Sequence, residues 1–299
     1  MRVSYAPGYV APITPGHIFP MSKFEILHRY LLDRDVLRDM DVITPRLVDY
    51  ADLTLVHTPR YLDGILNGNL SRKEERRLGL PWSPGLATRS CLAVQGTINA
   101  SMMALQDGIA GNLAGGTHHA MPDHGEGFCV FNDVAVAIRT LRRGMWIRRA
   151  LIIDLDVHQG NGNAAIFADD PDVFTFSMHG EKNYPFRKPP SSLDIGLPDG
   201  TGDRPYLKTL GDALDEIFGQ FQPDLVYYLG GIDPLEQDHF GRLSLTMDGL
   251  RHREHTVIDY VRRRNIPLVL LLAGGYAPTH RETAIAHAQM FEIATEVYG

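Results

Sequence analysis

Two carboxylates and a histidine occupy alternate positions in the segment Asp154-Leu-Asp156-Val-His158. Alternate side chains of an extended chain point to the same side, about 6.6 Å apart, so neighbours can share one ion. An isolated Asp-x-His could equally be a helix cap beside a surface histidine. Asp233, however, follows a separate apolar run and offers a third ligand. One histidine and two carboxylates around an open position suit Zn²⁺ or a related cation that activates water.

A pair of adjacent histidines follows two glycines in the segment Gly115-Gly-Thr-His-His-Ala120. Glycine lets the backbone approach a ligand closely, and histidine is the side chain whose ordinary pKa lies nearest neutral pH. We therefore interpret His118 and His119 as acid–base groups, although either histidine alone could be structural. Asp154, which is not needed as a ligand, can accept a hydrogen bond from one imidazole, and Asn161 can accept one from the other.

Tyr276 follows Gly274 and Gly275 directly after an apolar run. A phenol at such a strand end could point into a crevice and donate a hydrogen bond to a developing oxyanion. The alternative is a half-buried tyrosine on a turn. Taken together with the candidate metal ligands, Tyr276 is interpreted as catalytic.

Short apolar runs are predicted to be the strands that position these residues. They span 150–154, 173–177, 224–229 and 267–272. Near-continuous apolar runs are typical of parallel strands buried on both faces. Helical segments around 206–221 and 247–264 separate them, so the alternation predicts a doubly wound α/β fold. Ligands of such sheets bind at the carboxyl ends of the strands, which is where the chemical residues occur.

Three other segments are predicted to be packing helices: one that begins at Ser22, one over 86–105 and one over 132–143. The stretch Pro185 to Thr201 is rich in proline and glycine and is predicted to be a long loop over the rim of the sheet. Because no repeat or linker-like change of composition interrupts the chain, we expect a single domain over residues 1–299.

The composition excludes several classes of protein. With 29 Lys and Arg against 36 Asp and Glu, the formal charge is −7, which argues against a nucleic-acid groove. Two cysteines, Cys91 and Cys129, are too few for a disulfide framework and fit a reducing compartment. The sequence lacks a secretory leader and an apolar run long enough to span a bilayer, so we expect a cytoplasmic protein without a membrane partner. The oligomeric state is not predicted.

Several motifs occur in an order that resembles the zinc-dependent histone deacetylase superfamily, which includes bacterial members and the acetylpolyamine amidohydrolases. They are Gly16-His-Ile-Phe-Pro-Met-Ser-Lys-Phe24, Gly115-Gly-Thr-His-His-Ala120, Gly127-Phe-Cys-Val-Phe-Asn-Asp133, Asp154-Leu-Asp-Val-His-Gln-Gly-Asn-Gly162, Gly231-Ile-Asp-Pro-Leu-Glu-Gln-Asp238 and Gly274-Gly-Tyr276. The resemblance implies an arginase-like α/β fold with a mainly parallel eight-stranded sheet flanked by helices. Gln159 and Asn161 are similar to the class IV branch.

The resemblance also implies the roles of the site residues. One catalytic Zn²⁺ would be held by Asp156, His158 and Asp233. His119 would be the general base and later the acid, His118 its electrostatic neighbour, and Tyr276 the group that binds the carbonyl oxygen. A structural K⁺ would lie behind the zinc on main-chain oxygens, at the positions Asp154, Asp156, His158, Ser177 and Met178.

The implied reaction removes an acetyl or other acyl group from an N-acyl-lysine side chain in a protein or peptide. Phe128 and Phe186 are the expected walls of the substrate tunnel, although either could instead be a core residue. A small acylated amine is the alternative substrate. Polyamine-selective members carry an acidic residue seven positions after the third ligand, and that position is Phe240 here. An apolar rim offers no partner for a distal ammonium and favours acyl-lysine.

The sequence argues against two functions other than deacylation. An arginase-like enzyme with two manganese ions would need further carboxylates in its ligand motifs, whereas Gly160 and Leu235 occupy those positions. A non-catalytic sensor of acylated ligands would be expected to have lost a metal ligand, a histidine or the tyrosine, and this chain retains all of them. A hydrolase with one metal ion is therefore the predicted function.

Overall fold

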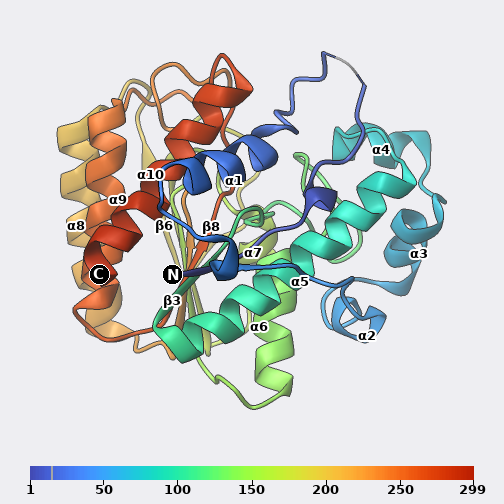
Figure 1. Ribbon diagram of the computed structural model, residues 1–299, viewed down its shortest axis with the longest axis horizontal. Coiled ribbons are helices and arrows are strands. Elements are labelled where there is room, and N and C mark those ends of the chain that lie inside the picture. The colour runs from blue at the N-terminus through green and yellow to red at the C-terminus, as the bar shows by residue number, and fades with distance from the viewer. Residues whose placement is uncertain (15) are drawn as a thin grey trace.

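An eight-stranded parallel β-sheet forms the centre of the computed structural model, which describes residues 1–14 and 16–299 (Figure 1). Its strands are β1 (Arg2–Ser4), β2 (Val42–Ile43), β3 (Ile109–Asn112), β4 (Ala150–Asp154), β5 (Val173–Gly180), β6 (Leu193–Leu197), β7 (Leu225–Leu229) and β8 (Leu268–Leu271). They lie in the order β2-β1-β3-β8-β7-β4-β5-β6, and each neighbouring pair is parallel. The predicted α/β fold with an eight-stranded sheet is confirmed.

Helices cover both faces of this sheet. The longer ones are α1 (Lys23–Asp33), α5 (Pro84–Asp107), α6 (Asp133–Arg143), α8 (Asp203–Gln220), α9 (Met247–Arg262) and α10 (His280–Tyr298). Figure 1 shows α8, α9 and α10 on one side of the sheet and α5 and α6 on the other. Short helices complete the chain: η1 (Pro7–Tyr9), η2 (Asp39–Asp41), α2 (Tyr50–Leu53), α3 (Pro59–Asn67), α4 (Arg72–Leu78) and α7 (Asn161–Ile166). Within the described ranges, none of the helices has the length and apolarity that crossing a membrane requires.

Local signals explain where the long helices begin and end. The Ser83 hydroxyl accepts a hydrogen bond from the Leu86 N–H at the start of α5, Pro84 occupies its first turn, and Gly108 ends it in the left-handed conformation. Asn132 caps α6 in the same way. Ser22 precedes α1 as predicted, but its hydroxyl faces His280, with 2.6 Å between Oγ and Nδ1, instead of capping the helix.

The structure adds four strands that were not predicted, which are β1, β2, β3 and β6. The predicted loop over 185–201 contains β6, which pairs with the carboxyl half of β5 at the edge of the sheet. Its side chains are exposed or half-buried except at Leu197, so it lacks the apolar run that marks a central strand. Strands of two to five residues such as these depend on pairing with distant neighbours more than on their own sequence.

The register of the central strands brings the chemical segments together. Asp154 at the end of β4 is level with Ser177 in β5 and with Leu229 at the end of β7. Leu229 is in turn level with Leu271 at the end of β8. The segments that follow β4, β7 and β8 therefore leave the sheet side by side, at the edge where ligands bind in parallel sheets.

Candidate active site

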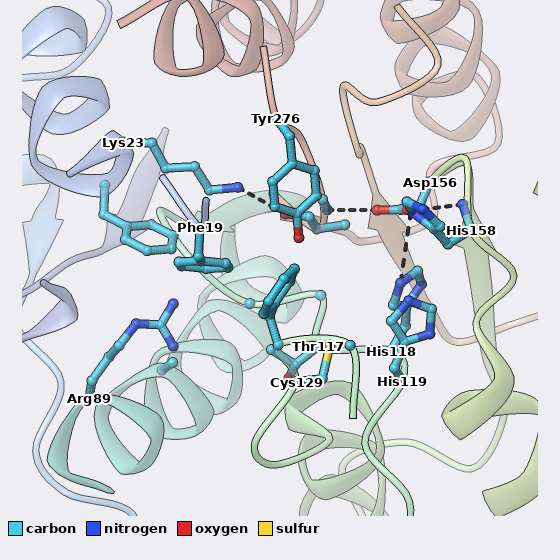
Figure 2. Close-up of a pocket in the computed structure, with 18 residues that line it drawn as sticks. Phe19, Lys23, Arg89, Thr117, His118, His119, Cys129, Asp156, His158 and Tyr276 are labelled. Atoms are coloured by element: carbon cyan, nitrogen blue, oxygen red, sulfur yellow. Dashed lines mark hydrogen bonds and ion pairs between the residues drawn. The ribbon is translucent and has the colours of Figure 1, made fainter. Parts of the chain in front are cut away.

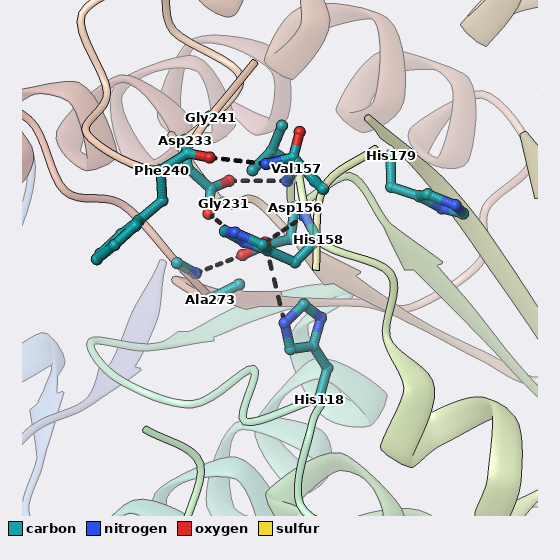
Figure 3. A network of polar contacts seen from close by, with 12 residues as sticks. His118, Asp156, Val157, His158, His179, Gly231, Asp233, Phe240, Gly241 and Ala273 are labelled. Carbon is teal, nitrogen blue, oxygen red and sulfur yellow. Dashed lines mark hydrogen bonds and ion pairs between the residues drawn. The ribbon is translucent and has the colours of Figure 1, made fainter. Parts of the chain in front are cut away.

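Three predicted metal ligands meet just beyond the ends of β4 and β7, where ligand atoms of Asp156, His158 and Asp233 lie within 4.8 Å of one another. Nδ1 of His158 is 3.0 Å from Oδ1 of Asp156 and 3.1 Å from Oδ2 of Asp233. Backbone amides orient both carboxylates, because Gly274 N–H donates to Asp156 at 2.6 Å and Val157 N–H donates to Asp233 at 2.8 Å. Figure 3 shows the three side chains pointing toward one another.

The charges of this triad fit a bound cation. Asp156 and Asp233 are fully buried, and within the described part of the chain neither forms an ion pair with a lysine or arginine. Burial and the charge of Asp156 raise the pKa of Asp233 to about 7. Burial alone would lower the pKa of His158, but its hydrogen bonds to the two carboxylates raise it to about 10. Two buried carboxylates beside an imidazole nitrogen are a suitable ligand set for a divalent metal ion.

Gly274 leaves room for the carboxylates at this point. A Cβ atom there would lie 2.4 Å from Oδ2 of Asp233 and 2.5 Å from Oδ2 of Asp156. Any larger residue would displace the oxygens that face the metal position. A glycine at position 274 is therefore required by the positions of these two carboxylates.

The two adjacent histidines are buried beside the triad, with ring centroids 4.0 Å apart. Nδ1 of His118 lies 2.7 Å from Oδ2 of Asp154, and Nδ1 of His119 lies 2.6 Å from Oδ1 of Asn161. The structure thus places one of the two predicted acceptors beside each imidazole, an assignment that the sequence had left open. Nε2 of His118 lies 3.9 Å from Oδ1 of Asp156 (Figure 2), whereas Nε2 of His119 has no hydrogen-bond partner among the described residues.

The surroundings of the two histidines shift their pKa values in opposite directions. Burial would lower the pKa of His118, but the charges of Asp154 and Asp156 raise it to about 9. Burial and the positive charges of His118 and His158 lower the pKa of His119 well below its ordinary value. At neutral pH one ring is cationic and the other is neutral, which gives neighbouring groups different roles in proton transfer.

A buried aspartate holds the histidine loop in place. Asp133, at the start of α6, accepts hydrogen bonds from the backbone N–H groups of Gly116 at 3.1 Å and Thr117 at 2.8 Å. It also accepts from the hydroxyls of Thr97, at 2.6 Å, and Thr117. Asp133 stands in a recognised motif, but only the structure reveals this supporting role.

Arg253 supports the segments of the candidate metal ligands from beneath the sheet edge. This fully buried side chain on α9 donates from Nη1 to the carbonyl oxygen of Gly231 at 2.7 Å and to that of Leu155 at 3.2 Å. Its Nη2 forms a 2.5 Å ion pair with Glu254. The two carbonyls belong to the segments that carry Asp156 and Asp233. No spacing pattern in the sequence marks Arg253 for this role.

Tyr276 lies between two cavities, and its hydroxyl points into the inner one (Figure 2). The inner cavity, of about 50 Å³, has the histidines and Asp156 on one side and Lys23 and Arg89 on the other. Both cations are buried, and burial lowers the pKa of Lys23 to about 8 and that of Arg89 to about 10. Within the described ranges neither cation has a carboxylate partner within 4 Å, and neither was predicted to belong to the site.

The outer cavity has a volume of about 330 Å³ and mainly aromatic walls. It is lined by Phe128, Tyr184 and Phe240, together with Tyr276 and His119. The ring of Phe240 meets that of Tyr276 edge-on, with 4.8 Å between centroids. Because His119 and Tyr276 line both cavities, a molecule passing from the outer to the inner cavity would contact both side chains.

The structure corrects the prediction that Phe186 forms a wall of the substrate tunnel. Phe186 is 94% exposed and lies outside the lining of both cavities. The inward position of this loop is taken by Tyr184, whose ring stands edge-on to His119 with 5.0 Å between centroids. The sequence resemblance in this loop could not distinguish Tyr184 from Phe186, because the two aromatic residues are only two positions apart.

The predicted potassium positions lie behind the triad at the ends of β4 and β5. Asp154, Ser177 and Met178 are buried there, and Asp154 pairs with Ser177 in the sheet. The carboxylate of Asp154 already contacts His118, and the Ser177 hydroxyl lies 2.9 Å from Nδ1 of His179. The side-chain oxygens are thus engaged, and the K⁺ site stays a prediction that rests on main-chain oxygens.

Comparison with known proteins gives one consistent result. The histone deacetylase domain matches residues 17–291. An uncharacterized protein of Picosynechococcus sp. is 46% identical over 99% of both chains, and histone deacetylase 2 of Arabidopsis thaliana is 32% identical over 87% of this chain and 70% of its own length. The crystal structure of a histone deacetylase homologue from Aquifex aeolicus is similar with a TM-score of 0.81 and 25% identity, covering 98% of this chain and 83% of that one.

Proposed function

Because this chain belongs to the histone deacetylase family of amide hydrolases, we propose that it is a zinc-dependent enzyme that removes acetyl or related acyl groups from N-acyl-lysine side chains. The observation that carries the proposal is the junction of the two cavities. His158 of the ligand triad, the neutral His119 and the phenol of Tyr276 line both cavities, and Asp156 lines the inner one. Such an arrangement is suited to metal-assisted hydrolysis of an amide.

The protein residues divide the work of this reaction. Zn²⁺ on Asp156, His158 and Asp233 would polarise the amide carbonyl and lower the pKa of a water molecule. His119, neutral because of its low pKa, accepts the proton of the attacking water at Nε2. The Tyr276 hydroxyl donates a hydrogen bond to the carbonyl oxygen as negative charge develops there. The leaving amine then takes a proton from the histidine pair.

The two cavities suit the two ends of an acyl-lysine. The outer cavity has apolar aromatic walls that can enclose the methylene chain of a lysine whose charge is masked by acylation. The small inner cavity can receive the acyl group. Lys23 and Arg89 at its far side would attract the carboxylate product, because both cations are buried and the described residues offer neither of them a carboxylate within 4 Å.

The composition of the outer rim favours acyl-lysine over a polyamine. Phe240 is 37% exposed at the mouth, where an acidic residue would be needed to bind a distal ammonium group. A structural K⁺ on the main-chain oxygens of Asp154, Asp156, His158, Ser177 and Met178 is part of the same proposal. Its role would be to fix the strand ends behind the zinc.

Metal analysis combined with a substrate panel tests the proposal. We expect one zinc per chain after reconstitution, loss of turnover on chelation and its recovery on adding Zn²⁺. Acetyl-lysine and longer acyl-lysine peptides should be hydrolysed faster than acetylated polyamines. The matched control is Asp233→Asn, which should lose both the metal and the activity. Two bound metals per chain, or turnover of polyamines alone, would contradict the proposal.

A further inference from the structure

A carboxylate outside the predicted site completes the hydrogen bonds around His119. Oε1 of Glu126 accepts a hydrogen bond from Nδ2 of Asn161 at 2.6 Å, and Oδ1 of the same amide lies 2.6 Å from Nδ1 of His119. Asn161 is 3% exposed and the Glu126 side chain 13%. Glu126 is thus one amide away from the proposed base.

The backbone around Glu126 is anchored to the same place. The Glu126 carbonyl accepts a hydrogen bond from the Cys129 N–H at 2.9 Å, and these two residues form an isolated antiparallel bridge. The next residue, Gly127, has a φ of 56° and packs so closely on His119 that a Cβ there would lie 2.5 Å from its Cδ2. The Glu126 carboxylate is therefore held at a fixed position relative to the imidazole.

The chemistry of these groups allows one proton arrangement. A carboxylate can only accept hydrogen bonds, so the Asn161 NH₂ group must face Glu126 and its carbonyl oxygen must face His119. Nδ1 of His119 must then be the donor and carry the proton. Nε2 is left with a free lone pair toward the cavities. If the amide were turned over, its NH₂ group would require an unprotonated Nδ1, and the proton would move to Nε2, where it blocks the base.

We propose that Glu126 is a positioning residue that fixes the orientation of the Asn161 amide and thereby selects the tautomer in which His119 can act as a base. The inference rests on the proposed function for its catalytic meaning. The tautomer itself is a property of the folded protein and can be measured separately.

The surroundings of Glu126 keep it in the accepting form. Burial would raise the pKa of this carboxyl, but hydrogen bonds from His124, Asn161 and Tyr184 lower it below its ordinary value. Nε2 of His124 lies 3.5 Å from Oε2, and this imidazole is itself 2.6 Å from the exposed Asp123. One carboxylate oxygen therefore holds Asn161, while His124 approaches the other.

The alternative role is structural, in which Glu126 simply holds together the two loops that carry His124 and Tyr184. Two variants separate the roles. Glu126→Ala removes the acceptor, whereas Glu126→Gln keeps an oxygen that Asn161 can donate to. His124→Ala is the matched control, because it removes a different contact of Glu126 and leaves Asn161 untouched. If Glu126 positions the amide, Glu126→Ala should lower kcat about 10- to 100-fold with KM within about twofold, the range for a lost supporting hydrogen bond.

We expect Glu126→Gln to recover most of this activity and His124→Ala to stay within about twofold of wild type. A second background sharpens the test. In Asn161→Asp the carboxylate accepts from Nδ1 in either orientation, so adding Glu126→Ala should cost less than about twofold. Equal losses in both backgrounds, or an unaffected Glu126→Ala enzyme, would overturn the proposal.

The ¹⁵N NMR spectrum of His119 in the zinc-loaded protein gives the readout that does not depend on turnover. We expect a protonated Nδ1 and an unprotonated Nε2 in the wild type, and a mixture or the opposite tautomer in Glu126→Ala. A wild type protonated at Nε2, or a tautomer that is unchanged in Glu126→Ala, would reject the proposal. Absence of acyl-lysine turnover together with the expected tautomers would instead reject the proposed function alone.

Discussion

At the scale of single residues, the Tyr276 phenol is placed to donate and not to ionise. Burial and the charges of Asp156 and Asp233 raise the pKa of Tyr276 well above its ordinary value, so the hydroxyl keeps its proton at any working pH. Its backbone N–H donates to Asp238 at 2.6 Å, which fixes the turn that carries it. A donor held in this way can stabilise an oxyanion without rearrangement.

Tyr276→Phe should therefore lower kcat by roughly 10²–10³ and leave zinc content and thermal stability nearly unchanged. The hydroxyl is not a metal ligand, and the remaining ring keeps the edge-on contact with Phe240. The measurement is steady-state turnover of an acetyl-lysine peptide, with zinc quantified in the same preparations. If the variant turns over at the wild-type rate, Tyr276 has no part in the mechanism.

The second prediction at this scale concerns Phe240. Phe240→Glu should favour acetylated polyamines as substrates, because the new carboxylate would pair with the distal ammonium group of the polyamine. Because the side chain is 37% exposed, solvent screens the pair, and we expect a gain of about 0.4–1 kcal/mol, or about 2- to 5-fold in relative kcat/KM. Phe240→Gln is the neutral control, and added salt should reduce the gain. A wild type that already prefers acetylspermidine would contradict the assignment to acyl-lysine.

At the scale of elements, α9 fastens the ends of β4 and β7 through one buried side chain. Arg253 donates to the carbonyls of Leu155 and Gly231, while its neighbour Glu254 accepts a 2.5 Å hydrogen bond from Tyr228 on β7. Asp156 and Asp233, the proposed metal ligands, stand one and two residues beyond those carbonyls. Packing of a helix against a sheet is thereby connected to ligand geometry.

Arg253→Met should destabilise the fold by about 3–5 kcal/mol, because it leaves Glu254 buried without its ionic partner. Adding Glu254→Gln removes the unpaired charge and should recover much of that loss. The double variant should still bind zinc about 10- to 100-fold more weakly, because the two carbonyls have lost their common donor. Urea unfolding of the metal-free proteins and competition with a chelator measure the two effects. A double variant with wild-type zinc affinity would show that α9 does not position the ligands.

At the scale of the whole molecule, the fold buries histidines in their neutral form. Acidic pH therefore favours the unfolded chain, in which these histidines can bind a proton. His57 is 2% exposed, with Nδ1 3.1 Å from the Met121 carbonyl oxygen and Nε2 accepting from the Asn132 N–H at 3.0 Å. Burial lowers the pKa of His57 to about 4, and burial also lowers the pKa of His179 to about 4. The unfolded chain binds these protons near pH 6.5, so the folded state is penalised as pH falls from about 6.5 to 4.

Between pH 7.5 and 5.5, His57 alone should reduce the free energy of unfolding by about 1.4 kcal/mol. The contribution of His57 to the free energy of unfolding is fully present above the pKa that this histidine has in the unfolded chain. It is lost as the pH falls and the unfolded chain takes up the proton. Urea unfolding of the metal-free protein at the two pH values measures the change, and His57→Gln should remove that share of it. If the variant and the wild type lose the same free energy of unfolding between pH 7.5 and 5.5, His57 is not the group that titrates.

The sequence by itself determined the central strands and the ligand motifs. Strands β4, β5, β7 and β8 contain near-continuous apolar runs, and a run buried on both faces is recognisable without its neighbours. Asp156 and His158 follow one run and Asp233 follows another, so parallel pairing alone predicted that they would meet. Their partners Asp154 and Asn161 were also predictable, because they lie in the same short segment.

Only the tertiary structure decided which distant side chains complete the site. Glu126, Asp133 and Arg253 act through hydrogen bonds that join segments 17 to 98 residues apart, and no local pattern encodes such pairs. The choice of Tyr184 over Phe186 depends on how one loop turns over His119. Strand β6 exists because the edge of β5 was available for pairing. Periodicity and spacing in a sequence describe residues that are neighbours along the chain. The hydrogen bonds of Glu126, Asp133 and Arg253, and the pairing of β6, instead depend on which polar groups of distant segments the fold brings together.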